Sequence, residues 1–169
     1  MLTIRKMRTN LPIEEDALYL SLGSNMGDRE GNIRQALSRL EQKWGIPCEA
    51  CSSLIETQPW GRWKERPTPF LNAVARFRIP KPSDQSEDAL AAKALALLDA
   101  CKEVERALGR EEILEFDQDG ERIYHPRPID IDILLWGHAD IDLPTLKIPH
   151  PRMWERDFVT RPLEELSGH

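Results

Sequence analysis

The segment from Pro126 to Trp136 constrains the fold more than any other part of the chain. After Pro128 its residues alternate between the two faces of an expected β-strand, and isoleucines at alternate positions strengthen that prediction. One face would carry Ile129, Ile131, Ile133 and Leu135, and the other Asp130, Asp132, Leu134 and Trp136. The first face is apolar enough to lie in a core, so the two aspartates are expected to point away from it.

The two aspartates would lie close together for like charges. Two steps of ~3.3 Å place their Cβ atoms roughly 6.6 Å apart, and each carboxylate then raises the pKa of the other unless a cation lies between them. Mg²⁺ is usually held by one or two such carboxylates together with substrate phosphates. A solvated strand face is the alternative. The poor strand propensity of Asp, the apolar neighbours and the adjacent Arg127 favour a metal–phosphate site.

Composition limits the possible partners. The 169 residues, 40% of them hydrophobic, fit one domain with a proper core, and the formal net charge of −6 argues against sequence-independent binding to nucleic acid or anionic membranes. No apolar run approaches the ~20 residues that span a bilayer, and the basic N-terminus is not followed by the apolar segment of a secretion signal. Three cysteines, an odd number, fit a reducing compartment. We expect a cytoplasmic monomer.

The remaining sequence predicts further strands and two capped helices. Residues 1–17 are interpreted as an N-terminal extension, and 18–169 as a single domain. The expected elements are a strand over 17–22, a helix capped by Asp28 and ended by 45–47, strands over about 48–56 and 70–79, a helix capped by Ser86 or Ser83 and ended by Gly109, a loop over 110–128, the Asp strand, and a mostly irregular C-terminus. This β-α-β-β-α-β order predicts an α+β, ferredoxin-like fold: an antiparallel sheet with helices on one face and the active site on the other.

Several other residues leave more than one interpretation open. The glycine-rich turn over 23–28 could offer backbone N–H groups to a phosphate, but it is not a Walker A motif. His150 could be a rigid turn residue or a nucleotide contact. Phe70, Asn72 and Phe158 could belong to the core, or form an aromatic slot with an amide for a flat heterocycle. Arg110, Arg127, Arg156 and Arg161 suit phosphate oxygens but also an ordinary surface.

The ordered motifs resemble those of one enzyme family. Leu22–Asn25, the Pro126–Leu134 block, Ile148–His150 and the pair Arg156 and Phe158 are similar to the 6-hydroxymethyl-7,8-dihydropterin pyrophosphokinases of folate synthesis. The resemblance runs in order from about Leu18 to Leu166. It implies a ferredoxin-like enzyme that transfers the β,γ-pyrophosphoryl group of ATP to the pterin hydroxymethyl oxygen and releases AMP.

The resemblance also implies roles for individual residues. Asp130 and Asp132 would hold two Mg²⁺ ions against the ATP phosphates, and Arg110 and Arg127 would be catalytic by neutralising charge during transfer. The implied ATP contacts are Lys102, Glu105, Arg110, Arg127, Ile133, His150 and Arg156. The implied pterin contacts are Thr57, Gln58, Trp60, Phe70, Asn72 and Phe158, with the two phenylalanines enclosing the ring.

The chain departs from the family pattern between Arg110 and Arg127. This loop is longer than in many relatives and strongly acidic, and Tyr124 and His125 stand where an aromatic-glycine pair is common. A merely solvated hairpin is the favoured interpretation of the acidic residues; if they close over ATP, their charge opposes binding. Two competing functions therefore remain: a non-catalytic pterin- or nucleotide-binding module, and a metal-dependent phosphodiesterase.

Overall fold

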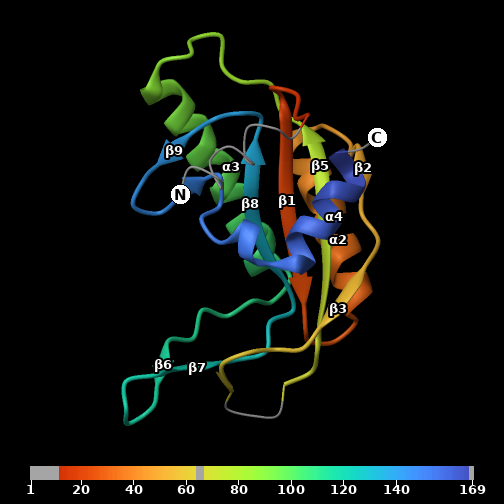
Figure 1. The fold of residues 1–169 in the computed structure, drawn as a ribbon, viewed down its shortest axis with the longest axis vertical. Helices are drawn as coiled ribbons and strands as arrows, with labels where there is room; N and C mark the ends of the chain where they lie inside the picture. The colour runs from red at the N-terminus through yellow and green to blue at the C-terminus, as the bar shows by residue number, and fades with distance from the viewer. Residues whose placement is uncertain (1–11, 64–66, 168–169) are drawn as a thin grey trace.

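Strand β1 (Ala17–Ser24) lies at the centre of the main sheet, between β5 (Phe70–Arg78) and β8 (Asp130–Trp136) (Figure 1). The computed structural model describes residues 12–63 and 67–167. Both pairings of β1 are antiparallel. The mixture of helices with an antiparallel sheet fits the predicted α+β class.

The outer side of β5 pairs with two short strands, where the sequence predicted one strand over 48–56. These strands, β2 (Ala50–Cys51) and β3 (Ile55–Thr57), both run antiparallel to β5. Between them the Ser52 hydroxyl accepts a hydrogen bond from the Val74 N–H and donates one to the Ser53 carbonyl. The side chain thus takes part in the backbone pairing there, and the sheet order is β2 and β3, then β5, β1 and β8.

Two helices cover one face of this sheet, as predicted (Figure 1). Helix α2 (Arg29–Trp44) begins after Asp28, whose carboxylate accepts the Gly31 N–H, and helix α3 (Glu87–Ala107) begins after Ser86, which caps it in the same way. Their apolar stripes pack on the isoleucine face of β8 and on alternate residues of β1 and β5 in one core cluster. Within the part of the chain that the structure describes, none of the helices has the length and apolar character needed to span a membrane.

The predicted alternation along β8 fails in its second half. Ile133 pairs with Leu20, but Leu135 rather than Leu134 pairs with Tyr19, so Leu134 is the extra residue of a β-bulge. The bulge moves Leu135 into the second core cluster, beside Leu134, and returns Trp136 to the first. The prediction that Leu135 shares a face with the isoleucines is therefore wrong, and so is the placement of Trp136 with the aspartates.

The other face of the sheet carries the C-terminal segment, which the sequence analysis wrongly predicted to be mostly irregular. A 3-10 turn, η1 (Met153–Glu155), leads into helix α4 (Asp157–Ser167), which lies against β5 on the face opposite α2 and α3 (Figure 1). Val159 and Leu163 bury one side of α4 in the second core cluster. This burial offsets the helix bond that Pro162 cannot make.

The predicted loop over 110–128 contains a hairpin. Its strands, β6 (Glu115–Phe116) and β7 (Arg122–Tyr124), form a small sheet with β4 (Arg62–Trp63), which runs parallel to β7. The Asp117 carboxylate closes the turn by accepting the N–H groups of Asp119 and Glu121. A further pair, β9 (Ile141–Asp142) and β10 (Lys147–Ile148), follows β8.

Part of the predicted N-terminal extension can be placed. Residues 1–11 lie outside the described residues, whereas Ile13 is 7% exposed and belongs to the second core cluster. Strand β1 begins at Ala17. The division into an extension over 1–17 and a domain over 18–169 stays a prediction.

Candidate active site

A hollow of about 770 Å³, its open mouth included, lies where β1, β5 and β8 meet the small sheet. Its lining of aromatic side chains with a few polar and charged groups suits a small-molecule site. It brings together all six predicted pterin contacts with both aspartates and two of the predicted arginines. These residues are Thr57, Gln58, Trp60, Phe70, Asn72, Phe158, Asp130, Asp132, Arg127 and Arg156. Its lining also includes residues that the sequence analysis did not assign to the site: Ser21, Gly23, Pro59, Trp63 and Tyr124.

The floor of the hollow is built by Asn72 and Gly23, which face each other across β5 and β1. The Asn72 amide nitrogen donates to the Ile55 carbonyl at 3.1 Å and to the Thr57 hydroxyl at 2.8 Å, which fixes the side chain. Its carbonyl oxygen is turned toward Gly23, where a Cβ would come within 3.1 Å of it. A glycine therefore leaves room above the floor, and the Asn72 oxygen remains available to accept a hydrogen bond.

Aromatic rings form one wall. The Trp63 ring lies 6.0 Å from that of Phe70 and 5.7 Å from that of Tyr124, and the Trp60 ring lies 5.8 Å from Tyr124. Gly61 has a φ of +91°, and a Cβ there would come within 2.9 Å of the Tyr124 ring. The pairing of β4 with β7 thus places Trp63 and Tyr124 at the site. Sequence periodicity gave no signal for this, because a parallel pair of two residues each has no repeat to detect.

The two carboxylates of β8 have different surroundings. Asp130 accepts a hydrogen bond from Arg110 at 2.7 Å, and its second oxygen lies 3.5 Å from the Arg127 guanidinium. Among the described residues no hydrogen bond or ion pair reaches the Asp132 carboxylate. Burial, and next the charge of Asp130, raise the pKa of Asp132 to about 7. A carboxyl group with a raised pKa and no partner would bind a cation at neutral pH, because the cation would stabilise its ionised form.

Arg110 is fixed by a buried carboxylate beneath the strand. Glu105, 2% exposed, accepts the Ile131 N–H at 2.9 Å and also pairs with Arg110, while Lys102 lies 3.6 Å away. Burial raises the pKa of Glu105, against the opposing effect of Arg110 and the Ile131 N–H. Burial also acts to lower the pKa of Arg110, but Asp130 and Glu105 outweigh it and raise that pKa. Arg110 therefore stays charged beside Asp130.

The backbone of Arg127 is fastened to the end of β1. Asn25 accepts the Arg127 N–H through its side-chain oxygen at 2.7 Å, and the Asn25 N–H donates to the Arg127 carbonyl at 3.1 Å. Asn25 is 1% exposed, so these two hydrogen bonds between the loops are shielded from water. The two bonds hold the glycine-rich turn after β1 beside the segment before β8.

A second hollow adjoins the first and shares Tyr124 and Arg127 with it. Its remaining lining comes from the acidic loop and its flanks: Arg110, Glu111, Glu112, Ile113, Leu114, Arg122, Ile123, His125 and Pro126. Of the predicted catalytic residues, Arg110 lines the second hollow and Arg127 lines both, and each contacts the Asp130 carboxylate.

Four predicted ATP contacts lie outside both hollows. Ile133 is 3% exposed in the first core cluster, and Glu105 is buried as described. Lys102 lies beside Glu105 on α3. His150 is half-buried and accepts the Arg152 N–H at 3.2 Å; burial, and next the charge of Arg156, lower its pKa, so it is neutral at pH 7. Their contact with ATP stays a prediction.

The donor set of the site fits magnesium bound through a ligand. No cluster of three or more His, Cys, Asp or Glu residues suited to a metal occurs in residues 12–63 and 67–167. Two aspartates alone are the usual protein share of a magnesium site completed by substrate phosphates. The residues present are therefore compatible with a metal that arrives with a nucleotide.

Comparisons with known proteins agree with this geometry. A family model described as 7,8-dihydro-6-hydroxymethylpterin-pyrophosphokinase (HPPK) matches residues 19–168. The chain is 41% identical to a 2-amino-4-hydroxy-6-hydroxymethyldihydropteridine pyrophosphokinase of Porphyromonas gingivalis over 89% of this chain and 90% of that protein. It is 35% identical to the enzyme of that name from Bacillus subtilis, over 88% of this chain and 76% of that protein. It is 39% identical to a folate synthesis bifunctional protein of Arabidopsis thaliana, over 90% of this chain and 27% of that protein. The chain belongs to the HPPK family.

Proposed function

We propose that this protein is a pyrophosphokinase that transfers the pyrophosphoryl group of ATP to 6-hydroxymethyl-7,8-dihydropterin in folate biosynthesis. The hydroxymethyl oxygen forms a bond to the β-phosphorus of ATP, and the bond from that phosphorus to the bridging oxygen of AMP breaks. The hydroxyl proton passes to solvent, and AMP leaves with the bridging oxygen. Family membership and the names of relatives that share most of the chain support this reaction.

The single observation that carries the proposal is the content of the first hollow. Aromatic rings with a fixed amide adjoin a pair of carboxylates and two arginines within one cavity. A flat heterocycle fits between Phe70 and Phe158, with the Asn72 oxygen accepting a hydrogen bond from its N–H edge. Its hydroxymethyl group would then lie toward Asp130 and Arg127.

The charged part of the site suits the phosphates of ATP. Asp130 and Asp132 would hold magnesium, which when bound neutralises phosphate charge and orients the phosphate chain. Arg110 and Arg127 supply fixed positive charge where negative charge builds up, and fixed charge is the main contribution that phosphoryl transfer needs from a protein. No side-chain nucleophile is required. Following the family resemblance, we propose two magnesium ions rather than one.

We also propose that the main sheet and its two covering helices have the ferredoxin-like topology. The order of the main strands, β2 and β3, then β5, β1 and β8, with crossovers through α2 and α3, supports the ferredoxin-like topology. The site would lie on the face away from these two helices, with α4 beside it. A monomeric, cytoplasmic enzyme remains our expectation.

Phosphorus NMR of the protein with Mg²⁺ and ATP, with and without 6-hydroxymethyl-7,8-dihydropterin, tests the proposal. AMP and a pterin diphosphate should appear only when the pterin is present. ADP and phosphate, or turnover without pterin, would instead indicate a phosphohydrolase. Pterin binding by calorimetry without any turnover would make the chain a non-catalytic binder.

A further inference from the structure

Helix α4 carries part of the candidate active site at its N-terminal end. Phe158 is its second residue and Arg156 directly precedes it, and both line the first hollow. Its buried side, formed by Val159, Leu163 and Leu166, packs against the sheet in the second core cluster. Apolar packing holds the helix on the sheet, but it is not directional and does not by itself fix where the helix stops along its axis.

This helix depends on outside contacts for its position. It has 11 residues and Pro162 in its interior, and so short a helix is marginal on its own in water. The last four carbonyls of a helix lack partners within it. The contacts made at the C-terminal turn of α4 therefore decide how that end is held.

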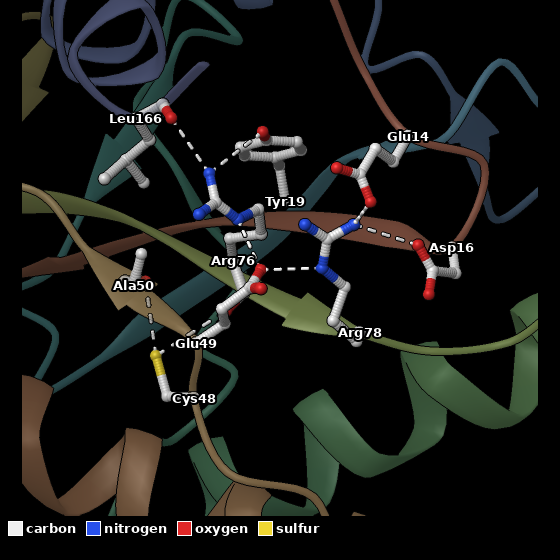
Figure 2. Close-up of polar contacts among 9 residues, drawn as sticks. All are labelled: Glu14, Asp16, Tyr19, Cys48, Glu49, Ala50, Arg76, Arg78 and Leu166. Atoms are coloured by element: carbon white, nitrogen blue, oxygen red, sulfur yellow. Dashed lines mark hydrogen bonds and ion pairs between the residues drawn. The ribbon is translucent and has the colours of Figure 1, made fainter. Parts of the chain in front are cut away.

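Arg76 of β5 makes such a contact (Figure 2). Its guanidinium donates to the Leu166 carbonyl at 2.9 Å and lies 5.9 Å over the Tyr19 ring, with the Tyr19 hydroxyl at 3.5 Å. A cation at this end also complements the helix dipole. The Arg76 side chain is only 12% exposed, so water screens the contact weakly. A second, exposed contact joins Glu165 to the Ser53 N–H at 3.2 Å and to the Ser53 hydroxyl at 2.7 Å.

The direction of Arg76 is itself fixed by a charged network. One oxygen of Glu49 accepts the Nε–H of Arg76 at 2.6 Å and that of Arg78 at 2.7 Å (Figure 2). Arg78 in turn pairs with Glu14 and, at 3.0 Å, with Asp16. Figure 2 shows Arg76 turned toward Leu166 and Arg78 turned away toward the two acidic residues. Arg78 lies on the same strand and shares Glu49 with Arg76, but within residues 12–63 and 67–167 it makes no hydrogen bond or ion pair with α4.

We propose that Arg76 is a positioning residue for pterin binding, which acts through helix α4. By holding the Leu166 carbonyl it fixes the helix along its axis, and thereby fixes Phe158, about 12 Å away at ~1.5 Å per residue, against the pterin slot. The effect on catalysis rests on the proposed function. The attachment of α4 does not, and it can be measured separately.

Two matched variants test the inference. Arg76→Met keeps the apolar stem and removes the donors to α4, whereas Arg78→Met removes the neighbouring charge and leaves that contact. We expect Arg76→Met to raise the KM for the pterin roughly tenfold, less than the ~100-fold that a 1 Å misplacement can cost. The KM for ATP should rise less, because Arg156 is the one proposed ATP contact next to α4. The value of kcat should stay within about twofold, since Asp130, Asp132, Arg110 and Arg127 are carried by other elements. Arg78→Met should leave all three constants within about twofold, and Arg76→Lys should restore part of the pterin KM.

Hydrogen exchange supplies a readout that does not need turnover. Arg76→Met should speed amide exchange across residues 157–167, with α2 unchanged, and Arg78→Met should not. Unchanged exchange in α4 would overturn the attachment. Faster exchange with an unchanged pterin KM would overturn the positioning role. If the wild type neither binds nor converts the pterin, the proposed function fails, while the exchange comparison still decides whether Arg76 holds the helix. If circular dichroism shows that Arg76→Met is unfolded, Arg76→Lys takes its place. Amide exchange across residues 157–167 must then be faster in Arg76→Lys than in the wild type.

Discussion

At the scale of single residues, Asp130 and Asp132 divide two tasks between them. Asp130 is neutralised by Arg110 and lies near Arg127, whereas Asp132 has no partner among the described residues. Asp132 is half-buried in the lining of the hollow, and an ionised carboxylate that loses water there without gaining a partner is costly. We propose that Asp132 serves a bound ligand.

Asp132→Asn should therefore stabilise the metal-free protein and abolish activity. The pKa of Asp132 is raised to about 7 from its ordinary value of 3.8, so its favourable contribution is present below pH ~4 and is lost as the pH rises through about 7. At pH 8 without Mg²⁺ the variant should gain about 1–2 kcal/mol, or roughly 2–8 °C in Tm, and near pH 4 it should match wild type. Calorimetric scans at both pH values check this. A lower Tm at pH 8, or near-normal turnover, would contradict it.

Arg127→Ala should lower the rate far more than pterin affinity. The side chain faces Asp130 at 3.5 Å and lies 6.0 Å from the Tyr124 ring, so its loss would remove fixed charge from the place that we propose for the reacting phosphates. We expect kcat to fall on the order of 10²–10³-fold, with pterin affinity by calorimetry within about threefold. Arg122→Ala is the control, because Arg122 lies 5.2 Å over the same ring and lines the second hollow, but has no ion pair with Asp130 among the described residues. Equal losses in both variants would show that the position of Arg127 beside Asp130 is not what matters.

At the scale of elements, the sequence predicted what local signals specify. Helices α2 and α3 and the start of β8 follow from caps and periodic apolar residues. Helix α4 was missed because Pro162 suggests an irregular segment, while the burial that offsets it depends on the far side of the sheet. The bulge at Leu134 depends on the register with β1, and no local pattern contains that information.

The small sheet beside the site should depend on aromatic packing more than on its ion pair. Arg62 pairs with Asp117, but the Arg62 side chain is 58% exposed, and exposed pairs contribute only about 0–1 kcal/mol. Tyr124 packs against Trp60, Trp63 and the space left by Gly61. Tyr124→Ala should weaken pterin binding by roughly tenfold or more, at about 0.5–1.5 kcal/mol for each aromatic pair lost. Arg62→Ala should change it by less than about threefold, measured by calorimetric titration. The reverse order would mean that the ion pair holds the loops.

At the scale of the whole molecule, the site is assembled from segments far apart in the chain. Gly23, Asn72, Asp130 and Phe158 meet because β5 and β8 pair on either side of β1, while α4 crosses the open face. Motifs named most of these residues in advance, since each motif is short and local. Trp63 and Tyr124 were not assigned to the site, because they reach it only through the pairing of β4 with β7.

The negative charge of the acidic loop should weaken the binding of ATP, which is itself negatively charged. Glu111 and Glu112 are exposed and line the second hollow beside Arg110 and Arg127, in a chain whose formal net charge is −6. Repulsion between these carboxylates and ATP is long-range and screened by salt, with a Debye length of about 8–10 Å. The double change Glu111→Gln and Glu112→Gln should lower the KM for ATP by roughly two- to fivefold at low ionic strength, and the difference should shrink as salt is added. The KM for the neutral pterin should not change.

The control is Glu30→Gln with Glu103→Gln, which removes the same charge from exposed positions on α2 and α3 and should have a smaller effect. If both double variants lower the KM equally, net charge alone is responsible; if neither does, the loop turns its carboxylates away from the bound nucleotide.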